Sequence, residues 1–371
     1  MLQRSGPLKG VRIVEMAGLG PAPFAAMHLA DLGAEVVRIA RPGQKFPLPI
    51  DAKYNLFNRS RRSLTLDLTK AGDVDRLWQL IEHAEVLIEG FRPGKMEKLG
   101  FGPEQVQARN PALVYGRLTG WGQEGPLAHA AGHDMNYAAI TGAVWGLGDA
   151  DRPPPAPMNL IADQGGGAMM LNVGILAALT HARATGQGQV VDTAMTDGVN
   201  LLMTMQHGLA ACGAWSDKRS GDFINGGVAW YRCYETGDGK YVSVGCVEPQ
   251  FFAELLALLG LTHDPRFADQ YAAAAQAGMM DALTALFQTA TQQEWCDILE
   301  GSDACFAPVV SLAGAPDHAH NRARGSFVTV DGIEMPAPAP RFSRTPPETP
   351  TTGDAGEIGL DEILEHWGNT A

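Results

Sequence analysis

The sequence has few cysteines, and their spacing argues against two kinds of stabilising site. Five are spread over 371 residues with no CxxC pair, at Cys212, Cys233, Cys246, Cys296 and Cys305. An odd number without that spacing is not typical of a disulfide framework or of a zinc site. We expect reduced, mostly buried thiols in a cytoplasmic protein, and no bound metal.

Basic residues are also scarce. Lysine and arginine number 28 against 41 aspartates and glutamates, which gives a formal net charge of −13. So acidic a chain is poorly suited to nucleic acid or to an anionic membrane as its main partner. Any cluster of arginines within it is correspondingly informative.

Long apolar runs are absent as well. None approaches the roughly 18 residues of a membrane span, and the first ten residues, MLQRSGPLKG, lack the apolar core of a secretion signal. Hydrophobic residues make up 45% and charged residues 19%, as in ordinary globular proteins. The length is sufficient for more than one hydrophobic core. We expect a cytoplasmic protein of more than one packed unit that does not enter a membrane.

The first half of the chain alternates β-branched runs with helical patterns. This alternation predicts βαβ units and an α/β fold with a parallel sheet. Strands are expected at 11–17, within 35–43, and at 84–90, 112–118 and 190–195, and helices at 24–33, 73–83 and 163–184.

After about residue 220 the pattern changes to that of a smaller α+β unit. The dipeptide Asp238-Gly239 lies between two alternating runs and predicts a hairpin with a two-residue turn. Apolar helices are expected over 250–260 and within 271–300, and a proline-rich tail follows. We predict a large domain over 1–220, a small domain over 221–325, and a C-terminal segment, 326–371, that returns to the large domain.

The stretch GLGPAP follows the first predicted strand and resembles the start of a dinucleotide-binding turn. That turn requires glycine at the sixth position, where this chain has Pro23. No acidic residue ends the second strand to bind a ribose; the chain has Arg38 and then Arg41 there. An NADP-dependent reductase is therefore a weak alternative.

Several arginines follow predicted strands, where open α/β sheets bind ligands. They are Arg38, Arg41, Arg59, Arg61, Arg62 and Arg92. Guanidinium groups match phosphate geometry, so a polyphosphate ligand is one interpretation. Solvated surface arginines are the other.

Two polar residues lie in glycine-bounded settings: His133 in AGHDMNY and Asp163 in NLIADQGGG. Taken alone, each has an ordinary interpretation, because single histidines are usually surface residues and an aspartate before a helix usually caps it. Together a histidine and a carboxylate also form an acid/base pair.

Nearly the whole chain resembles the class III CoA-transferase superfamily, and within it the branch of α-methylacyl-CoA racemases. The stretches that carry the resemblance occur in the family's order: GVRIVEMAGLGPAPFAAMHLADLGAEVVRI, VLIEGFRPG, LTGWGQEGP, AGHDMNY, NLIADQGGG, GQGQVVDTAM, VGCVEPQFF and MPAPAPRFS. The combination of AGHDMNY with NLIADQGGG is specific, whereas either alone is not.

The resemblance implies an isomerase that interconverts R and S 2-methylacyl-CoA thioesters, with no separate cofactor. It implies a Rossmann-like large domain, a small domain, and an interlocked homodimer whose active sites lie between subunits. His133 and Asp163 correspond to the acid/base pair, and Asn159 and Glu248 to its supporting residues. The residues corresponding to the CoA-binding positions are Arg38, Arg59, Arg92, Gly132 and Asp134. Gln164 departs from the family's aromatic residue, which affects the packing beside Asp163.

Racemisation next to a thioester needs a base on each face of the α-carbon and a stabilised enolate oxygen. Asp163 must hold a proton part of the time, which apolar surroundings promote. The main alternative is a CoA-transferase, in which Asp163 acts as the nucleophile. Such enzymes do not need a histidine at position 133, so the sequence favours the racemase. A catalytically silent CoA-binding protein is disfavoured because both proton-transfer groups are present.

Overall fold

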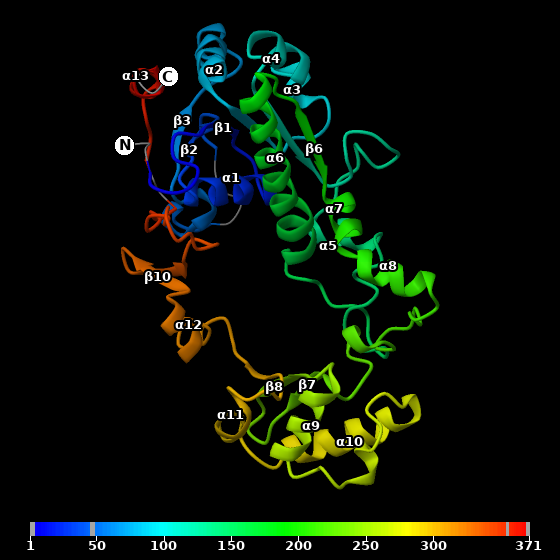
Figure 1. The fold of residues 1–371 in the computed structure, drawn as a ribbon. Coiled ribbons are helices and arrows are strands. Elements are labelled where there is room, and N and C mark those ends of the chain that lie inside the picture. Colours follow the sequence, from blue (N-terminus) through cyan, green and yellow to red (C-terminus); the bar gives the residue numbers. More distant parts are fainter. Residues whose placement is uncertain (1–3, 45–48, 354–355, 369–371) are drawn as a thin grey trace. The chain divides into compact units, whose positions relative to one another are not determined.

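The computed structural model describes residues 4–44, 49–353 and 356–368 (Figure 1). Within it the chain forms two compact units. The first consists of 1–141, 157–203 and 322–371, and the second of 142–156 and 204–321. The segment 142–156 belongs to the second unit, although the predicted boundary placed it in the large domain. Hydrogen bonds explain why: Arg219 donates to the carbonyl of Leu147 at 2.8 Å, and Ser220 to that of Gly148 at 2.9 Å.

The first unit is built on a six-stranded sheet in the order β3-β2-β1-β4-β5-β6. All neighbouring strands are parallel, which confirms the predicted α/β fold. The strands are β1 (Arg12–Met16), β2 (Glu35–Ala40), β3 (Arg62–Thr65), β4 (Val86–Glu89), β5 (Val114–Thr119) and β6 (Val190–Ala194). The sequence did not predict β3, because its four residues, RSLT, include only one apolar side chain.

One face of this sheet carries a continuous hydrophobic core. Its helices are α2 (Ala71–His83), α3 (Lys95–Lys98), α4 (Pro103–Arg109) and α13 (Leu360–Gly368). Leu77, Trp78, Phe101 and Trp367 pack with the inward side chains of the strands. The short helices η1 (Ala52–Tyr54) and η2 (Leu56–Asn58) lie in the connection between β2 and β3.

Three helical segments pack closely together in the first unit: α1 (Pro21–Asp31), η3 (Leu160–Met169) and α6 (Met170–Thr185). The helix expected from residue 163 begins at Leu160, and its first ten residues form a π-helix. Asp163 therefore lies in the first turn and is not the cap. The helices α5 (Asp134–Ala139) and α7 (Met195–Leu202) also contact η3.

The three consecutive glycines let η3 approach its neighbours. A Cβ on Gly166 would lie 2.8 Å from the backbone nitrogen of Val199, and one on Gly198 would lie 1.8 Å from the carbonyl oxygen of Gly166. Side chains at these positions would push η3 and α7 apart. The glycines after Asp163 thus serve helix packing, which holds the turn containing Asp163 in place.

The second unit contains a three-stranded antiparallel sheet in the order β7-β8-β9. Its elements are α8 (Thr204–Ala211), η4 (Phe223–Asn225), β7 (Tyr231–Glu235), β8 (Tyr241–Gly245), α9 (Pro249–Leu258), η5 (Pro265–Phe267), η6 (Ala273–Ala275), α10 (Gln276–Phe287), α11 (Gln292–Leu299) and β9 (Phe306–Val309). The predicted hairpin is present, but its turn has three residues. Thr236 donates to the carbonyl of Lys240 at 2.9 Å, and Gly239 is left-handed (φ +73°), as in a turn followed by a bulge.

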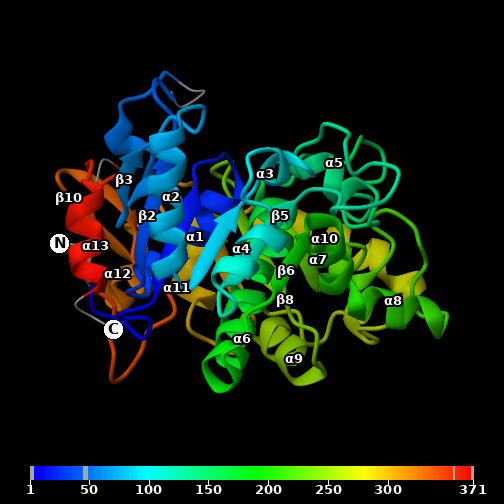
Figure 2. The same cartoon turned by 90° about the horizontal axis from the view of Figure 1, so that it is seen from above.

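The C-terminal residues from 322 onward belong to the first unit. After α12 (Ala319–Arg324), the strands β10 (Phe327–Val330) and β11 (Ile333–Pro336) form a hairpin. The red helix α13 lies beside the blue N-terminal elements in Figure 2 and packs on α2. Glu348 accepts the backbone N–H of Ser5 at 2.9 Å, so the two ends of the chain are tied together.

Two expectations about composition need qualification. The segment Leu160–Thr185 is long and apolar enough to span a membrane by length and composition, and half of its most apolar part is buried within the fold. The thiols are free, but Cys212, Cys233 and Cys305 are exposed, so the expectation of mostly buried cysteines was wrong.

Candidate active site

A cavity of about 410 Å³, here called the central cavity, opens at the carboxyl edge of the six-stranded sheet. Loops after β1, β4 and β5 form its walls, and these strands are neighbours in the sheet. The chain's direction of winding reverses between β1 and β4, where open α/β sheets bind ligands. Gly20, Arg92, Trp121, His133 and Asp163 are among the residues that line this cavity.

Asp163 lies on the strained entry to η3. Met158 and Asn159 both have φ of +56°, a left-handed conformation that is costly for residues other than glycine. The side chain of Asn159 lies near the carboxyl of Asp163 and favours its ionised form, which lowers its pKa. Asp163 also faces Gly20, where a Cβ would lie 3.5 Å from its Oδ2. The backbone conformation therefore brings the carboxyl between Asn159 and the start of α1.

The pKa of Asp163 is raised to about 6. Burial is the main cause, and the negative charge of Asp134 adds to it. The side chain of Asn159 and the charge of His133 act in the opposite direction. A carboxyl with such a pKa is present in both protonation states near neutral pH, as an acid/base group requires.

His133 comes to the same cavity from the start of α5, and its side chain is exposed. Its backbone N–H donates to Oδ1 of Asn136 at 3.0 Å, and its carbonyl accepts the N–H of Asn136 at 2.8 Å. These bonds fix the backbone of His133 at the helix start, while its imidazole remains open to the cavity.

Gly132 is held between two aromatic rings, which the sequence did not reveal. A Cβ there would lie 2.7 Å from Tyr137 and 3.1 Å from Trp121, and these rings pack edge to face at 4.8 Å between centroids. The hydroxyl of Tyr137 donates to the carbonyl oxygen of Gly132. Tyr137 follows His133 by four residues in AGHDMNY, and that helical spacing was the available signal.

Two further cavities adjoin the central one. The first, about 360 Å³, is lined by Arg38, Arg41 and Arg61 and shares Leu19 and Gly20 with the central cavity. We call it the arginine cavity. Among the residues that the structure describes, the hydrogen bond of Arg38 is a long one, 3.4 Å from its Nη1 to Oγ of Ser63.

The second adjoining cavity, about 470 Å³, shares Arg41 with the arginine cavity and Phe91 with the central cavity. Arg92, the next residue after Phe91, is exposed on the wall of the central cavity. The adjoining cavities therefore place arginines at one end and His133 with Asp163 at the other, an arrangement that suits an extended ligand with one charged end.

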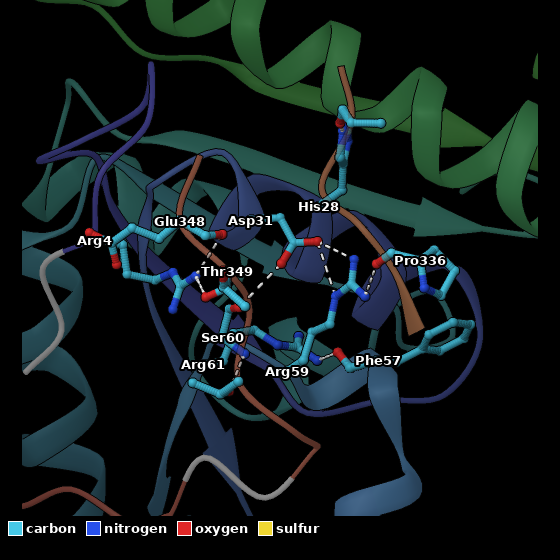
Figure 3. Close-up of polar contacts among 12 residues, drawn as sticks. Arg4, His28, Asp31, Phe57, Arg59, Ser60, Arg61, Pro336, Glu348 and Thr349 are labelled. Carbon is cyan, nitrogen blue, oxygen red and sulfur yellow. Dashed lines mark hydrogen bonds and ion pairs between the residues drawn. The ribbon is translucent and has the colours of Figure 1, made fainter. Parts of the chain in front are cut away.

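Arg59 does not join these cavities. It is 5% exposed, and its Nη2 lies 2.5 Å from Oδ2 of Asp31, while its Nη1 donates to the carbonyl of Pro336 at 2.7 Å (Figure 3). Ser60 donates to the other oxygen of Asp31 at 3.2 Å. The guanidinium thus joins α1 to the C-terminal hairpin. The family resemblance placed Arg59 among the CoA-binding residues, and the sequence does not reveal that Asp31 is its partner.

The remaining candidates occupy different places. Asp134 is buried beneath the central cavity and bonds to the backbone of η3. Glu248 lies in the second unit, exposed, as the residue before α9, and the central cavity is formed without it. Gln164 follows Asp163, and its Oε1 is buried without a hydrogen-bond partner among the described residues. Over those same residues, no group of three or more His, Cys, Asp or Glu side chains is placed to hold a metal ion.

Residues 8–355 match CoA-transferase family III. The chain belongs to this family. It is 41% identical over 365 residues to an α-methylacyl-CoA racemase of Mus musculus, which covers 97% of this chain and 93% of that one. It is 30% identical over 349 residues to an acetyl-CoA:oxalate CoA-transferase of Acetobacter aceti, covering 89% and 88%.

Among solved structures, a CAIB/BAIF family protein from Brucella suis aligns with a TM-score of 0.84 at 26% identity. The alignment covers 98% of this chain and 100% of that one. The sequence matches show membership of CoA-transferase family III, and the structural match shows the same fold over nearly the whole chain. The predicted resemblance is confirmed.

Proposed function

We propose that this protein is an isomerase that racemises 2-methylacyl-CoA thioesters by moving a proton on the α-carbon. The observation that carries the proposal is the pairing of His133 with Asp163 on one cavity, the latter with a pKa near neutrality. Identity to the mouse racemase exceeds identity to the oxalate transferase, 41% against 30%, and supports isomerisation over CoA transfer.

The two bases take opposite roles in the two directions. When His133 removes the α-proton from one face, protonated Asp163 delivers a proton to the other face. In the reverse direction, the carboxylate of Asp163 is the base and the imidazolium of His133 is the acid. Between the two transfers the thioester is an enolate, whose oxygen needs hydrogen-bond donors. Backbone N–H groups near Gly132 and Asp134 are the proposed donors, because N–H groups at a helix start lack partners within the helix.

The CoA portion of the substrate extends from the central cavity to the arginines. Arg38 and Arg92 are proposed to bind its phosphates through charge-assisted hydrogen bonds. The reaction we propose uses only the substrate and these side chains, without a separate cofactor. We place the enzyme in the cytoplasm.

Hydrogen exchange tests this proposal directly. In deuterated water, the protein should exchange the α-hydrogen of a 2-methylacyl-CoA and interconvert its R and S forms without added cofactor. His133→Ala should abolish racemisation but retain faint exchange from the enantiomer handled by Asp163, and Asp163→Ala should show the converse. Loss of general acid–base help costs on the order of 10²–10⁴ in rate. Equal loss for both enantiomers in both variants would contradict two separate bases.

The alternative is CoA transfer, which the relationship to the Acetobacter aceti enzyme supports. There, Asp163 attacks the thioester carbonyl to give an acyl anhydride with release of the CoA thiolate. Hydroxylamine would trap that anhydride on Asp163. Formation of a new thioester when an acceptor carboxylate such as succinate is added would favour transfer over racemisation.

We further propose an interlocked homodimer in which Glu248 of one chain orients His133 of the other. Mixing His133→Ala with Glu248→Ala chains tests this arrangement. Each mixed dimer would then contain one intact site, so statistical mixing should restore about a quarter of the wild-type activity. If both residues act within one chain, mixing restores nothing.

A further inference from the structure

Asp134 is a buried carboxylate that bonds to the backbone carrying Asp163. It is the first residue of α5 and is 6% exposed. Its Oδ1 accepts the backbone N–H of Ala162 at 2.8 Å and that of Asp163 at 2.7 Å. One oxygen atom thus joins α5 to the first turn of η3, two elements separated by twenty residues of chain.

This contact links the two proposed bases. His133 directly precedes Asp134 in the chain, while Asp163 is bonded to its carboxylate through the backbone. We propose that Asp134 is a positioning residue, which fixes the separation of His133 and Asp163 and maintains a negative charge beside Asp163. This inference rests on the proposed function and specifies how that site is held together.

The burial of Asp134 supports this role over direct contact with CoA. Its Oδ2 is also buried, with no hydrogen-bond partner among the described residues. The charge of a buried carboxylate acts strongly on neighbouring groups, because little water is present to screen it. Its described hydrogen bonds are made with the backbone of η3.

The electrostatic surroundings of Asp163 include few other charges. Burial is the largest cause that raises the pKa of Asp163, and the charge of Asp134 is the second. The charge of His133 lowers that pKa. Both residues belong to the α5 side of the site. Tyr137, also on α5, has its own pKa raised, mainly by burial and next by Asp163. On the α1 side, the residue nearest the carboxyl is the uncharged Gly20.

Two substitutions separate the two parts of the role. Asp134→Asn keeps an oxygen that accepts both N–H groups but removes the charge, whereas Asp134→Ala removes both. The assay is exchange and racemisation of a 2-methylacyl-CoA across a pH range, with kcat and KM determined for each variant. Circular dichroism checks that both variants are folded.

We expect Asp134→Asn to stay within about tenfold of the wild-type kcat, because small geometric changes are tolerated when the hydrogen bonds persist. In the direction in which Asp163 is the base, the acid limb of the pH profile should move by roughly 0.5–1 pH unit to lower pH, since a like charge has gone. Asp134→Ala should lose about 100-fold in kcat for both enantiomers, as misplacement of reacting groups does. KM should change by less than about threefold in both variants, since uniform binding is intact.

Two results would overturn the proposal. An unmoved acid limb in Asp134→Asn, in the direction in which Asp163 is the base, would show that the charge of Asp134 does not act on Asp163. A raised KM with unchanged kcat in both variants would show that Asp134 binds the CoA ester instead.

Amide hydrogen exchange tests the positioning role without any activity. Peptides covering 157–170 should exchange faster in Asp134→Ala than in the wild type, and Asp134→Asn should match the wild type. If no acyl-CoA were turned over by the wild type, the proposed function would fail, yet this measurement would still decide whether Asp134 holds η3. Equal exchange in all three proteins would refute the positioning role.

Discussion

Replacing Asp163 by asparagine should stabilise the protein near neutral pH. Asparagine is neutral and nearly the same shape. The wild-type carboxyl has a pKa of about 6 in place of 3.8, mainly because burial disfavours its ionised form. Above about pH 6 the native state must therefore hold an unfavourable charge, which the variant lacks.

The size of the effect follows from this shift. About two pKa units correspond to roughly 3 kcal/mol. Because the side chain is only partly buried, solvent screening reduces this figure, and we expect a gain of about 1–2 kcal/mol. For a domain of 150–250 residues, each kcal/mol raises Tm by about 2–4 °C.

The sign of the pH dependence follows from linkage. A group whose pKa is raised on folding favours the native state fully below its unfolded pKa, here 3.8, and that contribution is lost as the pH rises through about 6. The advantage of Asp163→Asn should therefore be complete near pH 8 and should disappear near pH 4.

The assay is urea or thermal unfolding of both proteins at about pH 8 and about pH 4.5. Asp75→Asn, at an exposed position on α2, is the matched control and should show no pH-dependent gain. An equal gain at both pH values, or a loss at pH 8, would refute the electrostatic reasoning. A confirmed gain would show that the site lowers stability to keep a reactive carboxyl.

Three further predictions concern binding and packing. Arg38→Ala and Arg92→Ala should raise KM for a CoA ester with little change in kcat, because uniform binding energy appears in KM; steady-state kinetics with unchanged KM would contradict this. Arg59→Ala should cost about 3–5 kcal/mol in urea unfolding, because it leaves Asp31 buried without its partner; a loss below 1 kcal/mol would show that the pair is dispensable. Gly198→Ala should lower Tm and kcat together, because its Cβ meets the backbone of η3.

Four of the strands that the sequence predicted, β1, β2, β4 and β5, are almost entirely buried. Apolar runs such as VLI in β4 form most of these strands, as expected of central parallel strands. The edge strand β3 went unpredicted because it is short and mostly polar. The π-helical form of η3 was also beyond prediction, since it depends on close packing against α7 and α1 and not on any local pattern.

The candidate site divides in a similar way. His133 and Asp163 were found because glycines and a family pattern surround them, and the fold brings both to one cavity. Arg59 and Asp134 were assigned to ligand binding because they correspond to CoA-binding positions of the family. Their actual contacts, with Asp31 and with the η3 backbone, join residues distant in sequence, and no spacing rule reveals such partners.

The discontinuous first unit constrains the order in which the protein can fold during synthesis. Its hydrophobic core includes Ile358, Ile363 and Trp367, which the ribosome adds after the whole second unit. The sheet strands thus emerge early with part of their apolar face uncovered, while the second unit can complete its own core first. Chains that end before α13 would expose that face and be prone to aggregate. We therefore expect deletion of α13 to disable the central cavity, although no residue of α13 lines it.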